Sequence, residues 1–246
     1  MNISAPQLFD PFSPGVLTLF AVLYLTAPLW VRVSENIQMT IFVGMGILAL
    51  NHSLISAHEA MNWDDRTYVG GVLEHVKHLL LTGTYPLLPW ILFSLFGASL
   101  NNFKPSRRIL LILGSGGFSI SAYFLYESMQ ERIPFAQPSG EAMLTFFPAN
   151  TTFLIAALTG VLLIWAILEN KDSKVGLHHL GRLSLTLYVV HFIPLNIFAN
   201  ANLGLSSASV LVLAYTLLWW PISLVHQKRF PRHSLESILR SMTQQR

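Results

Sequence analysis

Apolar stretches of about the length needed to cross a lipid bilayer recur along the whole chain, with polar connections between them. A hydrocarbon core of about 30 Å needs about 20 consecutive apolar residues in a helix. The stretches that approach this length cover residues 14–31, 37–57, 85–100, 109–126, 151–168, 183–203 and 205–225. The pattern predicts an all-α fold. We expect a polytopic membrane helix bundle of about seven transmembrane helices. Residues 1–226 should form one domain and residues 227–246 a basic tail.

Two long connections fall on the same side of this scheme. Residues 58–84 contain apolar and polar positions at helical spacing, which predicts an amphipathic helix in the membrane interface. Its apolar side consists of Val72, Leu73, Val76, Leu79 and Leu80, and its polar side of Glu74, His75, Lys77 and His78. Residues 129–150 contain three prolines and should be irregular. Together the two connections could roof a cavity.

The composition and the placement of charge agree with a membrane protein. Hydrophobic residues make up 52% of the chain and charged residues 11%, against about 25% charged residues in a typical soluble domain. Of the 15 Lys and Arg residues, three lie on the side of the N-terminus and 12 on the other side. Because positive loops stay in the cytoplasm, the N-terminus should be outside and the C-terminus cytoplasmic.

The basic sequence pI of about 9.3 therefore reflects topology and contact with the lipid bilayer, and nucleic acid is not expected as a partner. We expect a multi-pass integral protein of a prokaryotic cytoplasmic membrane. The chain has no cysteine, which excludes disulfides, thiolate catalysis and metal sites with cysteine ligands.

The run GRLSLTLYVVHF, residues 181–192, carries polar side chains into a predicted span. At 100° per residue, Ser184, Tyr188 and His191 share one face of a helix, and Arg182 stands at its cytoplasmic edge. An ionisable side chain within a bilayer costs roughly 2.5 to 3.5 kcal/mol on insertion scales, so it needs a partner, a cavity or a function. Any site should be sought first on this polar stripe.

Other polar features have structural explanations that compete with a site. His52 and His191 are either structural histidines with satisfied hydrogen bonds or site residues. Because these two histidines lie on different predicted helices, we do not expect them to bind haem. Glu74, His75 and His78 are expected on a solvated surface, and we do not expect them to bind a metal ion. Gly114, Gly116 and Gly117 should permit close helix packing.

Several segments resemble one family when taken in order. Three segments are similar to segments of the heparan-alpha-glucosaminide N-acetyltransferase-like membrane proteins. They are PGVLTLFAVLYLTAPLWVRV from Pro14, TGTYPLLPWILFSLFGASL over residues 82–100, and TFFPANTTFLIAALTGVLLIW from Thr145. GRLSLTLYVVH resembles a helix of the related YeiB-like transmembrane acyltransferases. RHSLESILRSM resembles the Gly-Pro-Leu-Glu, then Leu-Arg, tail of that group, with His233 and Ser234 in place of Gly and Pro.

The resemblance implies acyl transfer across a membrane, typically of an acetyl group from cytoplasmic acetyl-CoA to a hydroxyl or amine acceptor, such as a saccharide. Members of the family begin with about three further helices, and their catalytic histidine follows the first span. The chain resembles the portion after those helices. We therefore expect a fragment, one half of a split protein whose partner chain supplies the missing helices, or a shortened relative without the chemistry. The family's catalytic histidine cannot be placed on any residue here.

Within this interpretation the residues of the stripe take distinct roles. Arg182 and Ser184 are candidates for binding the CoA donor, since a guanidinium group suits a phosphate. His191, Tyr188 and His52 are the catalytic candidates. His191 would act as a general base, and Tyr188 would donate a hydrogen bond to a developing oxyanion.

In a continuous helix His191 would stand roughly 13 Å beyond Arg182, which is within reach of a pantetheine arm. The alternative is a protein without enzyme activity, either a transporter subunit or a scaffold of a membrane complex.

Overall fold

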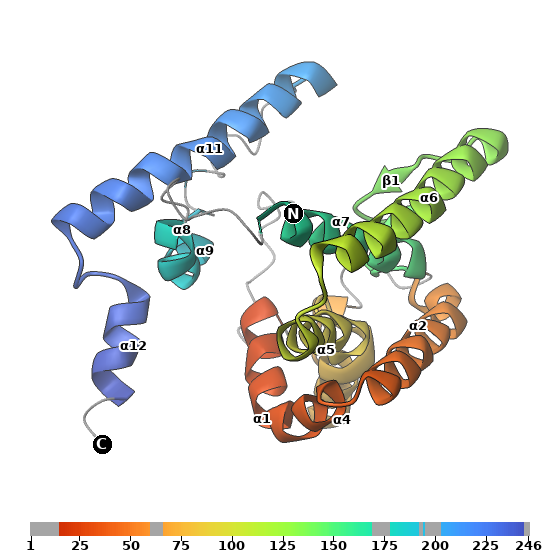
Figure 1. Ribbon diagram of the computed structural model, residues 1–246, viewed down its shortest axis with the longest axis horizontal. Coiled ribbons are helices and arrows are strands. Elements are labelled where there is room, and N and C mark those ends of the chain that lie inside the picture. Colours follow the sequence, from red (N-terminus) through yellow and green to blue (C-terminus); the bar gives the residue numbers. More distant parts are fainter. Residues whose placement is uncertain (1–14, 60–65, 169–177, 192–193, 195–202, 244–246) are drawn as a thin grey trace. The chain divides into compact units, whose positions relative to one another are not determined.

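The computed structural model describes residues 15–59, 66–168, 178–191, 194 and 203–243 (Figure 1). Most of these residues are helical, so the predicted all-α class is confirmed. The strands of the described part are the short β1, Ala136–Gln137, and β2, Leu144–Thr145, which pair with each other. The chain divides into two compact units, one of residues 9–170 and one of residues 171–246 with residues 1–8.

The described part of the larger unit is built on five long helices and one shorter helical segment. They are α1 (Val16–Ser34), α2 (Ile37–Glu59), α4 (Val72–Lys77) with the π-helical turn η1 (His78–Thr82), α5 (Leu87–Phe103), α6 (Arg107–Glu131) and α7 (Thr151–Leu168). Helix α5 packs against both α1 and α2, and α6 packs along α7. A core cluster of Leu100, Leu110, Leu162 and Ala166 joins α5 to the α6–α7 pair.

The boundaries of these helices follow from local chemistry. The Asn36 side chain accepts hydrogen bonds from the amides of Gln38 and Met39 and so begins α2. In the same way Asn150 accepts from the amide of Phe153 at 2.9 Å and begins α7. An asparagine at this position satisfies amides that have no partner within the helix. Lys104, with φ of 41°, ends α5 in a left-handed conformation.

Polar side chains link the helices of the larger unit where apolar packing would otherwise leave them unsatisfied. Ser99 of α5 lies 3.1 Å from the hydroxyl of Thr40 on α2. Asn51 of α2 donates to the carbonyl of Ala149 at 3.1 Å, and its Nδ2 also lies 3.4 Å from Oγ1 of Thr151, the first residue of α7. Such interhelical hydrogen bonds hold membrane helices in register.

The predicted spans agree with the described helices, except for one span that the structure describes only in part. Among the described residues, five helices are individually long and apolar enough to cross a membrane. The number is six if α4–η1 and α5, which are bent by 46° relative to each other, count as one broken span. The predicted span 151–168 coincides with α7, and the others begin or end within a few residues of theirs. The predicted span 183–203 lies partly outside the described residues.

The predicted amphipathic helix over 72–80 is present as α4 and η1, but His78 does not lie on its wet side. His78 is 1% exposed, and its ring lies 2.8 Å from the Thr82 hydroxyl and 3.1 Å from the Tyr68 carbonyl. Val72 and Leu73, on the predicted apolar side, are 84% and 85% exposed, as expected for side chains that contact lipid. The π-helical turn begins at His78, so the periodicity of 3.6 residues fails for this side chain.

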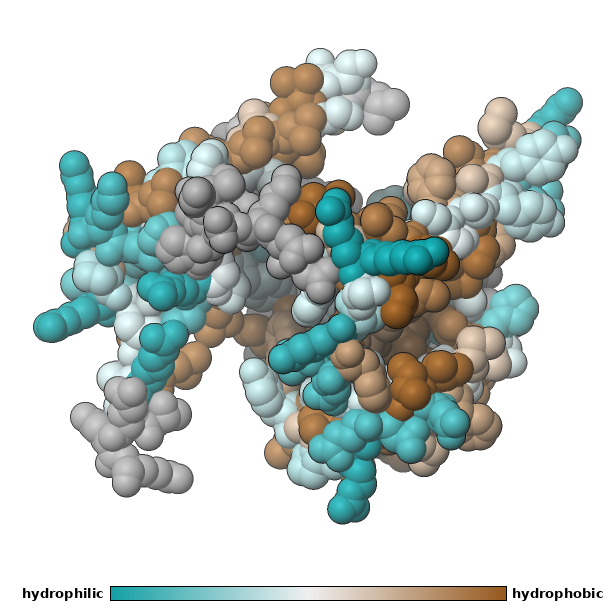
Figure 2. Space-filling model, in the orientation of Figure 1, coloured by the Kyte–Doolittle hydropathy of each residue, from teal (hydrophilic) through white to brown (hydrophobic). Residues whose placement is uncertain are grey.

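The smaller unit contains α8 (His178–Arg182), α9 (Ser184–Val190), α11 (Leu205–Arg229) and α12 (Leu235–Thr243). Helix α11 is a candidate span, and α8 packs against it while α12 packs against α9. Hydrophobic side chains lie on the visible surface of helices in both units (Figure 2). Leu25 of α1 is 82% exposed and Val210 of α11 is 66% exposed, as expected for helices that contact lipid.

Candidate functional site

The polar stripe predicted over residues 182–191 is divided between two short helices. Arg182 is the last residue of α8, and α9 begins at Ser184. Between them Leu183 is 4% exposed and has φ of −113° and ψ of 18°, outside the helical region. The predicted continuous helix is therefore wrong at this point, because the buried leucine turns the chain between the two helices. The rise of roughly 13 Å from Arg182 to His191 does not apply.

Helix α9 brings Tyr188 and His191 together as predicted. Their ring centroids are 5.8 Å apart, and both side chains are half-buried. Ser184 is exposed one turn before Tyr188. Three of the predicted site residues thus lie along one short helix, and Arg182 is exposed just before it.

His191 is oriented by two neighbouring groups. Its Nδ1 lies 3.1 Å from the carbonyl oxygen of Leu187. A carbonyl only accepts, so this contact places the ring proton on Nδ1 and the lone pair on Nε2 in the neutral ring. The backbone carbonyl of His191 accepts a hydrogen bond from the hydroxyl of Tyr215 on α11. Tyr215 in turn packs edge-on against Trp219, with ring centroids 5.7 Å apart.

Sequence reasoning did not identify the partners of α9 on the tail helix α12. Oε1 of Glu236 accepts from the amides of Leu185 at 2.7 Å and Thr186 at 3.1 Å. Its Oε2 accepts from the Thr186 hydroxyl at 2.6 Å, and that hydroxyl oxygen accepts from the amide of Leu235 at 2.9 Å. We call these contacts of Leu235 and Glu236 with Leu185 and Thr186 the tail clasp. The only sequence signal for it was the family resemblance of both segments.

The tail clasp changes the acidity of Glu236. Burial on its own raises the pKa of this carboxyl. The hydrogen bonds from the Thr186 hydroxyl and from backbone amides, including those of Thr186 and Leu185, act in the opposite direction. Together they hold the pKa below its ordinary value, because they favour the charged form.

A second set of hydrogen bonds fixes α8 to α11. Gln227 donates from Nε2 to the carbonyl of His179 at 3.0 Å, and its Oε1 pairs with Nδ1 of the same histidine. Helix α12 begins after Ser234, whose hydroxyl accepts from the amide of Ser237. The site residues of α8 and α9 are thus held by both α11 and α12.

His52 is not brought into this arrangement by any described contact. It belongs to α2 of the larger unit and is exposed. Its neighbour Asn51 is the buried residue, 7% exposed, that points into the unit. Sequence reasoning named the histidine and missed the asparagine, because both lie near the end of the same span and only the helix phase distinguishes them.

A small pocket lies where the two long connections meet, as their position on one side suggested. It is lined from the first connection by Arg66, Leu81, Gly83 and Thr84, from the second by Pro148 and Ala149, and otherwise by Asn51, Pro86, Pro89 and Trp90. Arg66 is 4% exposed. The cavity volume is about 10 Å³, which is the space that one water molecule needs. A saccharide does not fit it in this conformation.

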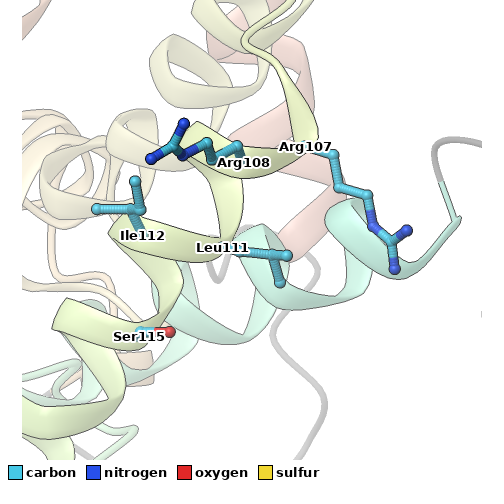
Figure 3. A pocket seen from close by; sticks show the side chains of 5 residues that line it. All are labelled: Arg107, Arg108, Leu111, Ile112 and Ser115. Carbon is cyan, nitrogen blue, oxygen red and sulfur yellow. The ribbon is translucent and has the colours of Figure 1, made fainter.

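An open groove of about 570 Å³ lies along the first turns of α6. Arg107 and Leu111 project to one side of the helix, and Arg108 and Ile112 project to the other (Figure 3). Basic residues at the end of an apolar helix are suited to contact with anionic phospholipid. Ser115 is the one hydroxyl residue in this lining, and neither a histidine nor a carboxylate accompanies it there, so the lining suits lipid better than acid–base catalysis.

Within the described ranges no group of three histidine, cysteine or acidic side chains is arranged to hold a metal ion. Residues 93–246 match the model of a family described as "Protein of unknown function (DUF418)". The match begins within α5 and includes α6, α7, the α8–α9 segment and both helices that hold it. No curated protein and no solved structure matches the chain.

Proposed function

Because this chain belongs to the DUF418 family of membrane proteins, which is related to the YeiB-like proteins, we propose that it takes part in acyl transfer across a membrane. The donor would be an acyl-CoA, typically acetyl-CoA. The acceptor would be a hydroxyl or amine, such as that of a saccharide. In this proposal the chain acts either alone or together with a partner chain that supplies further helices.

The observation that supports the proposal best is the pairing of Tyr188 and His191 on α9. With Nδ1 directed at the Leu187 carbonyl, the neutral ring of His191 has its basic lone pair on Nε2, the atom that would remove a proton from the acceptor. Tyr188 lies three residues before His191, and its hydroxyl can donate a hydrogen bond. In the transition state it would stabilise charge that develops on the thioester oxygen.

Arg182 and Ser184 would bind the donor at the turn between α8 and α9. Both side chains are exposed. A guanidinium group can pair with a phosphate through two parallel hydrogen bonds, and Ser184 can add a third. His52 stands apart as a candidate on the acceptor side, near the outer end of α2 in the predicted topology.

The test is acyl-CoA binding and acyl transfer by the purified full chain, with and without any partner chain. His191→Gln should spare CoA binding and lower the rate of transfer by about 10² to 10⁴, as for loss of a general base. His233→Gln, at an exposed histidine near α12, is the matched control. Arg182→Gln should weaken binding most at low salt because the contact is exposed, and Arg229→Gln is its control.

The measurements also separate the alternatives. Binding without transfer by the lone chain would indicate that catalytic helices come from a partner. No acyl-CoA binding in either preparation would contradict the proposal and favour the scaffold or transporter interpretation.

A further inference from the structure

The tail helix α12 presents an apolar face that the described part of the chain covers only in part. Leu235, Ile238 and Leu239 are 36%, 50% and 51% exposed. Their spacings of three and four residues place them on one side of the helix. The preceding Phe230 is 52% exposed as well. Exposed apolar side chains gathered on one side of a basic helix are typical of helices that lie in a membrane interface.

The position of α12 along the chain limits where this face can lie. Helix α11 has 25 residues, so it is about 37 Å long and exceeds a hydrocarbon core of about 30 Å. Helix α12 begins at Leu235, after the five connecting residues 230–234. Five extended residues reach at most about 18 Å. The amide of His233 donates to the carbonyl of Phe230 at 3.0 Å, so the connection folds into a turn. If α11 spans the bilayer, α12 therefore starts close to the lipid headgroups.

The charge of the tail indicates which lipids it would meet. Residues 227–246 contain five basic side chains, those of Lys228, Arg229, Arg232, Arg240 and Arg246. The single acidic residue of this tail, Glu236, is engaged in the tail clasp. A basic segment beside a span is attracted to anionic lipid headgroups.

The tail clasp also fixes how α12 is rotated. Glu236 lies about 110° from the centre of the apolar face, on the flank that contacts α9. Ser241 lies about as far from that centre on the opposite flank, and it is exposed. Only one face of α12 can therefore be directed at the bilayer while Glu236 contacts α9.

We propose that α12 is an interfacial helix: Leu235, Ile238 and Leu239 enter the anionic leaflet beside the end of α11, while Glu236 holds the adjoining flank on α9. The lipid surface then becomes part of what positions α9 and its polar residues. The lipid contact itself does not depend on the proposed acyl transfer.

The absence of cysteine allows a direct test with the full chain. Single cysteines in place of Leu239 or Ser241 are labelled with an environment-sensitive fluorophore and reconstituted in vesicles of phosphatidylcholine with or without phosphatidylglycerol. The label at position 239 should shift to the blue and resist a water-soluble quencher present on both sides, most strongly with phosphatidylglycerol. The label at position 241 should remain quenchable in both lipids.

Two further variants make the result specific. Glu236→Ala removes the contact that sets the rotation, so the difference in quenching between positions 239 and 241 should diminish. Arg232→Gln should reduce the effect of phosphatidylglycerol, and Arg132→Gln, at the far end of α6, should not. Equal quenching at both positions would overturn the proposal. A blue shift in detergent that grows with protein concentration would also overturn it, because a second copy of the chain would then cover the face.

Discussion

At the scale of single residues, the carboxylate of Glu236 is the group that joins the tail to α9. It accepts from two backbone amides at the start of α9 and from the Thr186 hydroxyl. A negative charge at this end of a helix is also favoured by the helix dipole. One side chain thus satisfies amides that have no partner within α9 and joins α9 to a segment about 50 residues away in sequence.

The lowered pKa of Glu236 predicts a dependence of stability on pH. A carboxyl with a lower pKa in the folded state contributes stability above its unfolded pKa, which is about 4.3 for glutamate. This contribution is lost as the pH falls through the folded value. Thermal unfolding of the wild type and Glu236→Gln should therefore differ at neutral pH and converge in acid.

Thr186→Val removes the hydroxyl that donates to Glu236 and should shrink the same difference. A gap between wild type and Glu236→Gln that stayed constant from neutral to acidic pH would show that the carboxylate charge does not stabilise the contact.

At the scale of elements, the closest packing in the larger unit is between α6 and α7. A methyl group added at Gly117 would lie 2.0 Å from Oγ1 and 3.0 Å from Cβ of Thr159 on α7. One added at Gly114 would lie 2.5 Å from a methyl carbon of Leu163. A methyl group added at Gly116 would have no other side chain or neighbouring helix within 4 Å. The predicted role in close packing is confirmed for Gly114 and Gly117, and Gly116 makes no such contact with the described residues.

This difference within one run of sequence predicts opposite outcomes for two matched substitutions. Gly117→Ala should destabilise the protein by about 1 to 3 kcal/mol, because the contact is with Thr159 close to its backbone and cannot relax easily. Gly116→Ala should be neutral or slightly stabilising, since alanine favours the helix. Thermal unfolding in detergent measures both, and a similar loss in the two variants would contradict the packing.

The sequence predicts the long helices well and the short ones poorly. The span 151–168 is recovered residue for residue because the Asn150 side chain begins the helix directly before it. The break at Leu183 could not be predicted, since an apolar residue within an apolar run carries no signal for a turn. The same holds for His78, whose burial depends on a π-helical turn and on the distant Tyr68 carbonyl.

For the candidate site, spacing alone was enough to place Tyr188 beside His191, because both lie within one turn of a helix. The tail clasp could not be derived from spacing, because Thr186 and Glu236 are 50 residues apart. A polar threonine in an apolar run and a lone glutamate in a basic tail are the residues that needed partners.

At the scale of the whole molecule, the described helices and the family agree on a multi-pass membrane protein. The orientation in the membrane is a prediction from the distribution of three Lys and Arg residues against 12. It places the connection over residues 58–84 outside and α12 inside. The roles proposed for Arg182 and for the tail depend on this orientation.

Single cysteines in place of Asn62 and Gln244 test the orientation in intact cells. A membrane-impermeant maleimide should label the cysteine at position 62 and leave the one at position 244 unlabelled until the cells are opened. The reverse pattern would invert the scheme and place the α8–α9 turn on the side without CoA.

The hydrogen bond of Asn51 has a consequence for how the protein is made. Its amide is buried in the finished structure and donates to Ala149, 98 residues further along. At about 5 to 20 residues per second, the ribosome needs roughly 5 to 20 seconds to synthesise that stretch. During this interval α2 has left the ribosome with a polar amide whose final acceptor does not yet exist. Its release into lipid is therefore expected to be delayed at the insertion machinery until α7 arrives.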